Sequence, residues 1–278
     1  MRDTLRSTFR RALGLENRRA AIRPGRLDRI SGFESTILGN RREIVVYLPD
    51  GYDKGERRYP VLYMLDGQNL FEPERSFAGQ TWDLADAINE AITVRTAGPM
   101  IIVGVDHAGV ARIDEYTPTT DPKKNAGGRA ADHLRMLVEE LKPLIDERYT
   151  TSSGAPQTAI GGSSLGGLFA LYAVLKRPDV FGAAAVMSPS VWWHDRVILH
   201  DVDAFADRDR PRVWLDIGGR EGSEAVGGAR ALRDRLRAKG WSDADFRYHD
   251  ERRGEHSERA WAGRVRKVLE FLFPPSEL

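Results

Sequence analysis

The strongest constraint on the fold of this chain is a serine set between glycines where a predicted strand meets a predicted helix. Residues 158–175 read TAIGGSSLGGLFALYAVL, which places Gly162, Ser164 and Gly166 at alternate positions. A serine on so tight a turn projects its hydroxyl beyond the edge of the sheet, beside the unpaired N–H groups of a helix N-terminus. Such a position suits a nucleophile that must stabilise an oxyanion. Ser163 does not fit this pattern, because Leu165 stands where the second glycine would be needed.

Apolar runs of strand length alternate with segments of helical spacing along the rest of the chain. The predicted strands cover residues 33–38, 43–48, 59–66, 100–105, 158–161, 182–188, 212–217 and 245–249. The predicted helices cover residues 81–92, 130–149 (interrupted by Pro143), 165–176, 228–239 and 257–272. This alternation predicts an α/β fold, a mostly parallel twisted sheet with helices on both faces. Residues 106–128 have no clear period and contain prolines and glycines, so we expect a long functional loop there.

Composition narrows the class of protein. The chain has 278 residues, a formal net charge of +1 and no cysteine. The balanced charge gives no drive toward nucleic acid, and the missing cysteines exclude disulfides, thiolate zinc sites and a cysteine nucleophile. No apolar run is long enough for a membrane span. With no repeat or linker in sight, residues 29–278 are predicted to form a single domain.

The N-terminal segment, residues 1–28, is predicted to be a basic leader outside that domain. Its first 26 residues contain eight arginines and no continuous apolar core, which argues against a secretory signal and favours a cytoplasmic protein. A solvated, flexible leader is one interpretation of this segment. A short basic amphipathic helix over residues 4–15, in contact with an acidic or lipid surface, is the other.

A serine hydroxyl needs a base to remove its proton, and histidine suits that role at neutral pH. Six histidines are present, at positions 107, 133, 194, 200, 249 and 256. His256 lies between the last predicted strand and the last predicted helix. That connection leaves the carboxyl end of a parallel strand, on the same rim as Ser164. His256 is therefore the predicted base.

The base in turn needs an acid to fix its tautomer. Glu221 follows the strand at residues 212–217 and falls on the rim loop, so it is the first candidate. Two alternatives stay open: Asp216, which lies inside the strand, and Glu224, which lies three residues after Glu221. The order Ser164, Glu221, His256 is that of α/β-hydrolases.

Two backbone N–H groups are expected to hold the oxyanion. One belongs to Leu165, directly after the serine, and the other to Gln68 in the loop Asp66-Gly67-Gln68-Asn69 after the strand at residues 59–66. Asp66 itself is interpreted as a structural carboxylate that closes this loop.

Several short motifs together resemble the esterase D-like family of α/β-hydrolases, over about residues 33–273. They are YMLDGQ at 63–68, DEYTP at 114–118, GSSLGG at 162–167, SPSVWW at 188–193 and GEH at 254–256. This family includes siderophore-ester hydrolases, feruloyl and acetylxylan esterases and S-formylglutathione hydrolases. The resemblance implies hydrolysis of carboxylic esters through an acyl-serine intermediate, with Gln68 donating to the oxyanion and with no metal or organic cofactor.

Five residues are candidates for substrate binding in a small-molecule ester hydrolase of this kind. They are Trp82, Arg112, Tyr116, Trp192 and Trp193. The two adjacent tryptophans follow a strand end on the rim, where aromatic rings bind acyl or aryl groups, although a structural role fits them equally. Trp82 either packs over the nucleophile or fills the core.

Three functions are compatible with these residues. The first is a serine esterase acting on a small to medium polar ester of the carbohydrate, aryl or siderophore type. The second is acyl transfer to a sugar or lipid hydroxyl by the same three residues. The third, a non-catalytic binding module, is disfavoured because such a module has no need to keep Ser164, His256 and the glycine-rich turn together.

Overall fold

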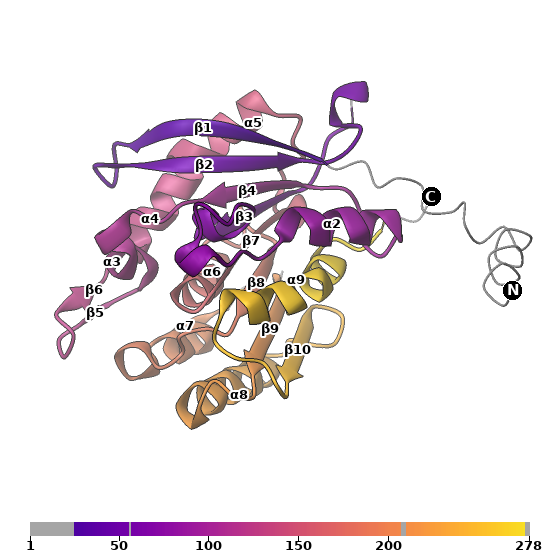
Figure 1. Cartoon of the computed structure of the whole chain (residues 1–278). Helices are drawn as coiled ribbons and strands as arrows, with labels where there is room; N and C mark the ends of the chain where they lie inside the picture. Colours follow the sequence, from indigo (N-terminus) through magenta and orange to yellow (C-terminus); the bar gives the residue numbers. More distant parts are fainter. Residues whose placement is uncertain (1–24, 56, 207–209, 276–278) are drawn as a thin grey trace, which may run out of the picture.

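The computed structural model of the chain describes residues 25–55, 57–206 and 210–275 (Figure 1). Most of the predicted leader, residues 1–24, and with it the amphipathic segment 4–15, lies outside this range. The first strand, β1, extends from Arg26 to Ser35, so it begins within the last residues of the predicted leader. That strand is longer than predicted at its start, since pairing with the neighbouring strand continues over its polar residues.

One eight-stranded sheet forms the centre of the molecule. Its spatial order is β1-β2-β4-β3-β7-β8-β9-β10. β1 pairs antiparallel with β2 and β2 antiparallel with β4, and every other neighbouring pair is parallel. After β1 the strands are β2 (Asn40–Leu48), β3 (Val61–Leu65), β4 (Ile101–Val105), β7 (Thr158–Ser163), β8 (Ala183–Met187), β9 (Arg212–Gly218) and β10 (Phe246–Glu251). The predicted mostly parallel sheet is confirmed.

Helices cover both faces of this sheet (Figure 1). One face packs against α2 (Leu84–Thr93) and α9 (Glu258–Leu272). The other packs against α4 (Ala130–Arg135), α5 (Lys142–Arg148), α6 (Leu165–Lys176), α7 (Ile198–Ala204) and α8 (Ser223–Ala238). The side chains of β3 alternate between the two faces of the sheet. Val61 and Tyr63 pack in the core on one face, and Leu62 and Met64 pack in the core on the other. Burial on both faces explains why the strands are continuously apolar.

The segment at residues 106–128 is more ordered than predicted. It contains the short helix α3 (Arg112–Tyr116) and a small hairpin of β5 (Thr120–Asp121) and β6 (Ala126–Gly127). Polar burial orders it: the carboxylate of Glu115 is fully buried, 3.0 Å from Arg42 and 3.1 Å from His133. Because these ordering contacts are between polar side chains, the sequence of this segment shows no periodic hydrophobic pattern that would predict its helix or its hairpin.

The helices differ from prediction in several places, and α2 begins three residues late, at Leu84. A π-helical stretch, Met136–Leu141, joins α4 to α5 just before Pro143, so the helix changes its hydrogen bonding instead of breaking. α7 was not predicted. α8 begins at Ser223, five residues early, because its internal Gly228 packs closely against the side chain of Val191 rather than marking a start. Within the described residues, no helix combines the length and the apolar character needed to cross a bilayer.

Candidate active site

Ser164 stands at the turn between β7 and α6, in a strained backbone conformation. Its φ is 58° and its ψ is −121°, a combination that non-glycine residues rarely adopt. The neighbouring backbone holds it there: the Ser164 N–H donates to the carbonyl of Met187 at 3.0 Å. Gly167 allows the helix to approach so closely, because a Cβ atom at that position would lie 2.8 Å from the same carbonyl oxygen. The sharp turn aims the serine side chain away from the sheet.

A chain of two hydrogen bonds extends from that side chain. His256 Nε2 lies 3.0 Å from Ser164 Oγ, and His256 Nδ1 lies 2.7 Å from Glu221 Oε2. The three residues come from the loops after β10, β7 and β9, which open at the same edge of the sheet. The structure thus brings together the three residues that the sequence pointed to, in hydrogen-bonding order.

The carboxylate of Glu221 is fully buried and firmly held. Its Oε1 atom accepts hydrogen bonds from the Gly218 N–H at 2.7 Å and from the Ser188 hydroxyl at 2.6 Å. Burial raises the pKa of Glu221, but the hydrogen bonds with His256, Ser188 and Gly218 outweigh it, so the pKa lies below its ordinary value. The group is therefore an anion beside the imidazole at neutral pH.

The two alternative acids lie elsewhere. Asp216 is buried and accepts from the indole N–H of Trp214 at 2.9 Å, and it lies 3.2 Å from Arg264. Burial raises its pKa, which the charge of Arg264 and the bond from Trp214 only partly offset. Glu224 is exposed in the first turn of α8. Among the described residues, neither side chain forms a hydrogen bond with His256.

Ser188 links this acid to the closing helix. Its hydroxyl oxygen accepts from the indole N–H of Trp261 at 3.0 Å and from Arg264 at 2.8 Å. With both acceptor positions filled, the single hydroxyl proton points to Glu221. Trp261 also places its ring edge-on against the imidazole of His256, with centroids 4.9 Å apart. Sequence reasoning assigned no role to these contacts, since Trp261 looks like any core residue of an amphipathic helix.

Leu165 and Gln68 carry the two backbone N–H groups that are predicted to hold the oxyanion. Leu165 opens α6, and Gln68 lies in the turn Gly67–Asn69 that follows β3. Neither N–H donates a hydrogen bond to another residue in the described part of the chain. Both donors are thus available to a ligand.

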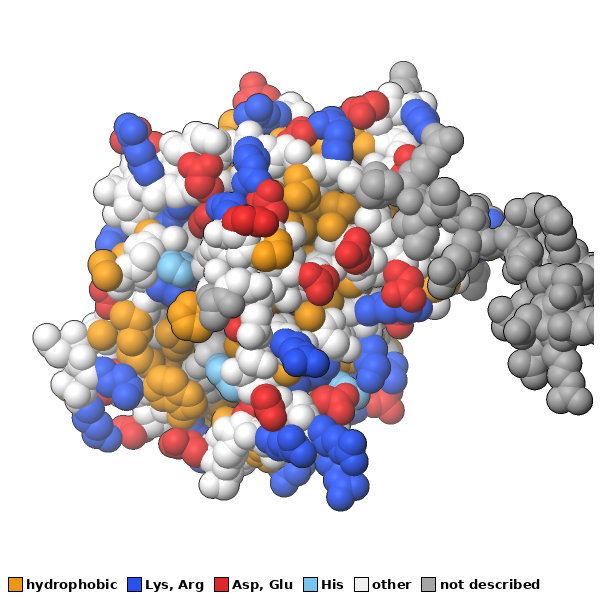
Figure 2. Space-filling view, viewed as in Figure 1, with side chains coloured by type: hydrophobic (Ala, Val, Ile, Leu, Met, Phe, Trp, Pro, Cys, Tyr) orange, Lys and Arg blue, Asp and Glu red, His pale blue; other side chains and the backbone are white. Residues whose placement is uncertain are grey.

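A pocket of about 260 Å³ opens over Ser164 and His256. The other side chains on its wall are those of Asp66, Gln68, Asn69, Phe77, His107, Arg112, Ser163, Glu258 and Trp261. On the face drawn in Figure 2, histidine side chains lie beside exposed hydrophobic ones. Phe77 is 73% exposed and stands at the mouth of the pocket. The wall therefore mixes aromatic, charged and amide groups.

Of the predicted substrate-binding residues, Arg112 alone is on this wall. Its guanidinium donates to both carboxylate oxygens of Asp66, at 2.7 Å each. Tyr116 lies behind it, fully buried under the guanidinium, and its hydroxyl accepts from the Asp66 N–H at 3.3 Å. The structural role foreseen for Asp66 agrees with these contacts.

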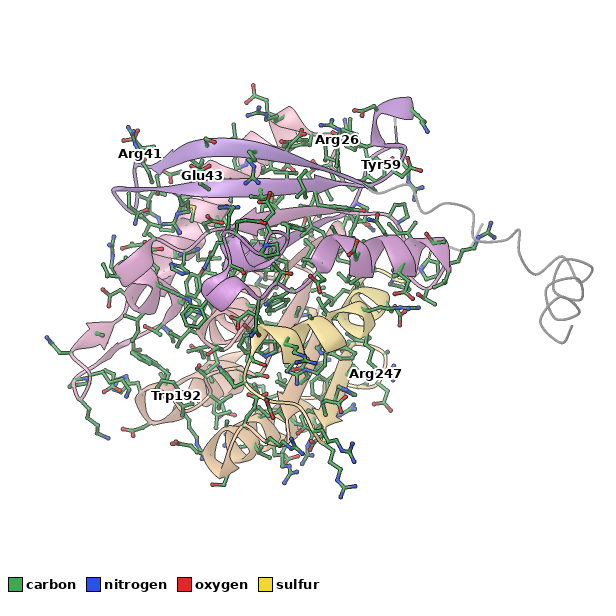
Figure 3. The ribbon with its side chains drawn as sticks, viewed as in Figure 1. Arg26, Arg41, Glu43, Tyr59, Trp192 and Arg247 are labelled. Atoms are coloured by element: carbon green, nitrogen blue, oxygen red, sulfur yellow. The ribbon has the colours of Figure 1, made fainter. Side chains whose placement is uncertain are left out.

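The three predicted tryptophans do not line the pocket. Trp82 is buried against Trp261, with ring centroids 5.8 Å apart, and fills the core beneath α2 and α9. Trp193 is fully buried, and its indole N–H donates to the carbonyl of Thr119 at 3.0 Å. Trp192, labelled in Figure 3, lies outside the pocket, 5.2 Å from the ammonium of Lys124. Both tryptophans thus contact the segment at residues 106–128 rather than the pocket over Ser164.

Metal ions in proteins are held by sets of side chains such as those of His, Asp and Glu. Within the part of the chain that the structure describes, no three His, Asp or Glu side chains converge closely enough to hold a metal ion.

Comparison with known proteins places this geometry in context. A family model with the description "Putative esterase" matches residues 35–272. The Bacillus subtilis protein YbbA is 24% identical over 247 residues, which cover 84% of this chain and 93% of YbbA. The siderophore enterobactin esterase of Emericella nidulans is 28% identical over 194 residues, covering 68% of this chain and 61% of that protein.

Solved structures show the same architecture. The BES protein from Bacillus cereus superposes with a TM-score of 0.70 at 24% identity, covering 89% of this chain and 94% of that one. At this level of identity the likeness concerns the fold, and it agrees with the α/β-hydrolase arrangement of strands and helices.

Proposed function

The chain belongs to the esterase family, whose model spans residues 35–272, and is a carboxylic ester hydrolase; we propose that it acts through an acyl-serine intermediate on Ser164. The observation that carries this proposal is the continuous hydrogen-bonded chain from Ser164 Oγ through His256 to Glu221, with distances of 3.0 and 2.7 Å. Such a chain is what a serine needs to become a nucleophile at neutral pH.

In the first half of the reaction, His256 Nε2 takes the hydroxyl proton while Ser164 Oγ attacks the ester carbonyl carbon. The carbonyl oxygen becomes an oxyanion, and the free N–H groups of Leu165 and Gln68 stabilise it. The tetrahedral intermediate then collapses. The bond to the alcohol oxygen breaks, and His256 returns the proton to the departing alcohol.

In the second half, a water molecule attacks the acyl group and gives its proton to His256. Collapse of the second intermediate releases the carboxylic acid and returns the proton to Ser164. Glu221 carries no proton in either half. Its buried carboxylate holds the Nδ1–H tautomer of His256 and stabilises the imidazolium that forms twice per cycle.

The pocket supports a small to medium polar ester as the substrate. Its volume of about 260 Å³ suits a small acyl or alcohol group, and its wall supplies amide and charged groups as well as aromatic rings. Esters of the carbohydrate, aryl or siderophore type all present such groups. The enterobactin esterase named above supports the last of these classes.

A fluorophosphonate probe tests the mechanism. We expect the probe to label Ser164 covalently, and Ser164→Ala to lose both labelling and the hydrolysis of 4-nitrophenyl acetate. Peptide mapping by mass spectrometry identifies the labelled residue. Steady turnover by Ser164→Ala, or labelling at another serine, would overturn the proposed nucleophile.

A further inference from the structure

The wall of the pocket carries an unequal set of charges. Asp66, Arg112 and Glu258 all line it. Because Arg112 donates to both carboxylate oxygens of Asp66 at 2.7 Å, these two charges largely cancel. Glu258 makes no salt bridge with any residue in the described ranges. The charge of Glu258 also acts on Arg112, but two carboxylates and one guanidinium leave an excess of one negative charge beside the reacting serine.

Glu258 is held toward the pocket by a single contact. It is the first residue of α9, two positions after His256, and it is half-buried. Its Oε1 atom accepts from the side-chain amide of Asn69 at 3.4 Å, whereas Oε2 has no hydrogen-bond partner among the described residues. An acidic residue in the first turn also stabilises the helix dipole, and that role alone would leave the chemistry at Ser164 unaffected.

The groups next to Glu258 also favour a ligand with a positive charge. Phe77, which is 73% exposed, brings an aromatic ring to the same pocket, and aromatic faces attract cations. Trp261 also lines the pocket, but its ring is packed against Trp82 and His256. His107 adds no positive charge, because its Nδ1 accepts the Gly109 N–H at 2.9 Å and burial lowers its pKa. The pocket thus combines an excess negative charge with one exposed aromatic ring.

We propose that Glu258 selects substrates by charge, favouring esters that carry an ammonium or similar cationic group near the ester bond over esters that carry an anionic group there. The inference rests on the proposed hydrolysis at Ser164 and names the substrate class of that site. A unit charge within about 5 Å of a partly solvated carboxylate changes binding on the order of tenfold. Because solvent ions reach the pocket, rising salt weakens the preference.

Two matched ester series test this proposal. The first keeps 4-nitrophenol as the leaving group and compares 4-(trimethylammonio)butanoate with its neutral isostere 5,5-dimethylhexanoate and with the anionic hemiglutarate. The second keeps the acetyl group and compares acetylcholine with 3,3-dimethylbutyl acetate and with 3-acetoxypropanoate. We expect a cation-to-anion ratio of kcat/KM of about ten or more in at least one series, and the series that shows it identifies the side of the ester that faces Glu258.

The variant Glu258→Gln should lower that ratio at least about fivefold, and Glu258→Lys should invert it. The matched control is Glu255→Gln, which removes an exposed carboxylate paired with Arg220 at 3.4 Å outside the pocket and should leave the ratio unchanged. A ratio that Glu258→Gln does not move, or a wild-type preference for the anionic esters, would overturn the inference. Failure of Ser164 to react with a fluorophosphonate would instead remove the proposed function, so the two failures are distinguishable.

Discussion

The hydroxyl of Ser188 donates its only proton to the carboxylate of Glu221 at 2.6 Å. Its oxygen is occupied at the same time by the indole N–H of Trp261 and by the guanidinium of Arg264. The hydroxyl therefore cannot reverse its direction without losing two contacts. Ser188 is a positioning residue that acts on His256 through Glu221.

Replacing Ser188 by alanine should lower kcat/KM about tenfold, because Glu221 loses a donor and Trp261 loses its acceptor. With one hydrogen bond fewer, the pKa of Glu221 should rise toward its ordinary value. The loss relative to wild type should therefore grow as the pH falls from 7.5 to 5.5. Initial rates across this range measure it, and a loss that is the same at every pH would indicate a purely structural role.

The identity of the acid can be tested with three conservative amides. Glu221→Gln should reduce kcat on the order of 10³-fold, since the amide cannot stabilise the imidazolium of His256. Glu224→Gln, at an exposed position, should retain wild-type kcat. Asp216→Asn should chiefly lower the thermal midpoint, because it leaves Arg264 without its buried partner. A larger loss of kcat in Asp216→Asn than in Glu221→Gln would reassign the acid.

The pair formed by Arg112 and Asp66 should affect the chemical step more than binding. Asp66 starts the turn that presents the Gln68 N–H, and its φ of 56° needs support from its neighbours. Arg112→Lys removes the bidentate contact, so we expect kcat to fall roughly tenfold with a smaller change in KM. Steady-state kinetics on 4-nitrophenyl acetate separate the two effects. A change in KM alone would show that Arg112 acts only on the bound substrate.

Glu115 should make the stability of the fold depend on pH. Burial raises its pKa, but the hydrogen bond with His133 and the charge of Arg42 outweigh it and lower the pKa to about 2. Because the folded-state pKa lies below the ordinary value of 4.5, its contribution is fully present above about pH 4.5 and disappears as the pH falls toward 2. Glu115→Gln should cost roughly 3 kcal/mol at pH 7.

Urea unfolding followed by circular dichroism between pH 2.5 and 7 checks this prediction. The wild type should lose stability steeply below pH 4.5, and the variant should lose less over the same interval. Parallel curves for the two proteins would mean that another carboxylate controls acid unfolding.

Much of the fold could be predicted from local patterns. The strand, turn and helix around Ser164 follow from a short apolar run, the glycines beside the serine and a second apolar segment of helical length, which is buried over Leu165–Leu175. The proximity of His256 and Glu221 to Ser164 follows because loops at the carboxyl ends of parallel strands share one edge of a sheet. These inferences need only the chain order of the elements and a general rule of topology.

The remaining features depend on contacts between distant residues. Trp261 and Ser188 are 73 residues apart, and Arg112 and Asp66 are 46 apart. No period or spacing in the sequence reports such pairs. Trp192 and Trp193 were placed at the pocket because they follow a strand end, but the backbone turn after β8 directs them elsewhere. The direction of a side chain after a strand depends on that turn.

The buried charges of Asp216, Glu221 and Arg264 link the stability of the protein to its activity. Asp216 and Glu221 are two carboxylates in a space that holds one guanidinium, Arg264, so the resting protein carries an excess negative charge there. The charges balance when the imidazolium forms. Replacing Asp216 and Arg264 together with apolar residues of similar volume would remove desolvated charges and raise the melting temperature. The net charge beside His256 would stay the same, but Ser188 would lose the guanidinium that helps to fix its hydroxyl on Glu221. Thermostable variants selected at these two positions should therefore be slower enzymes.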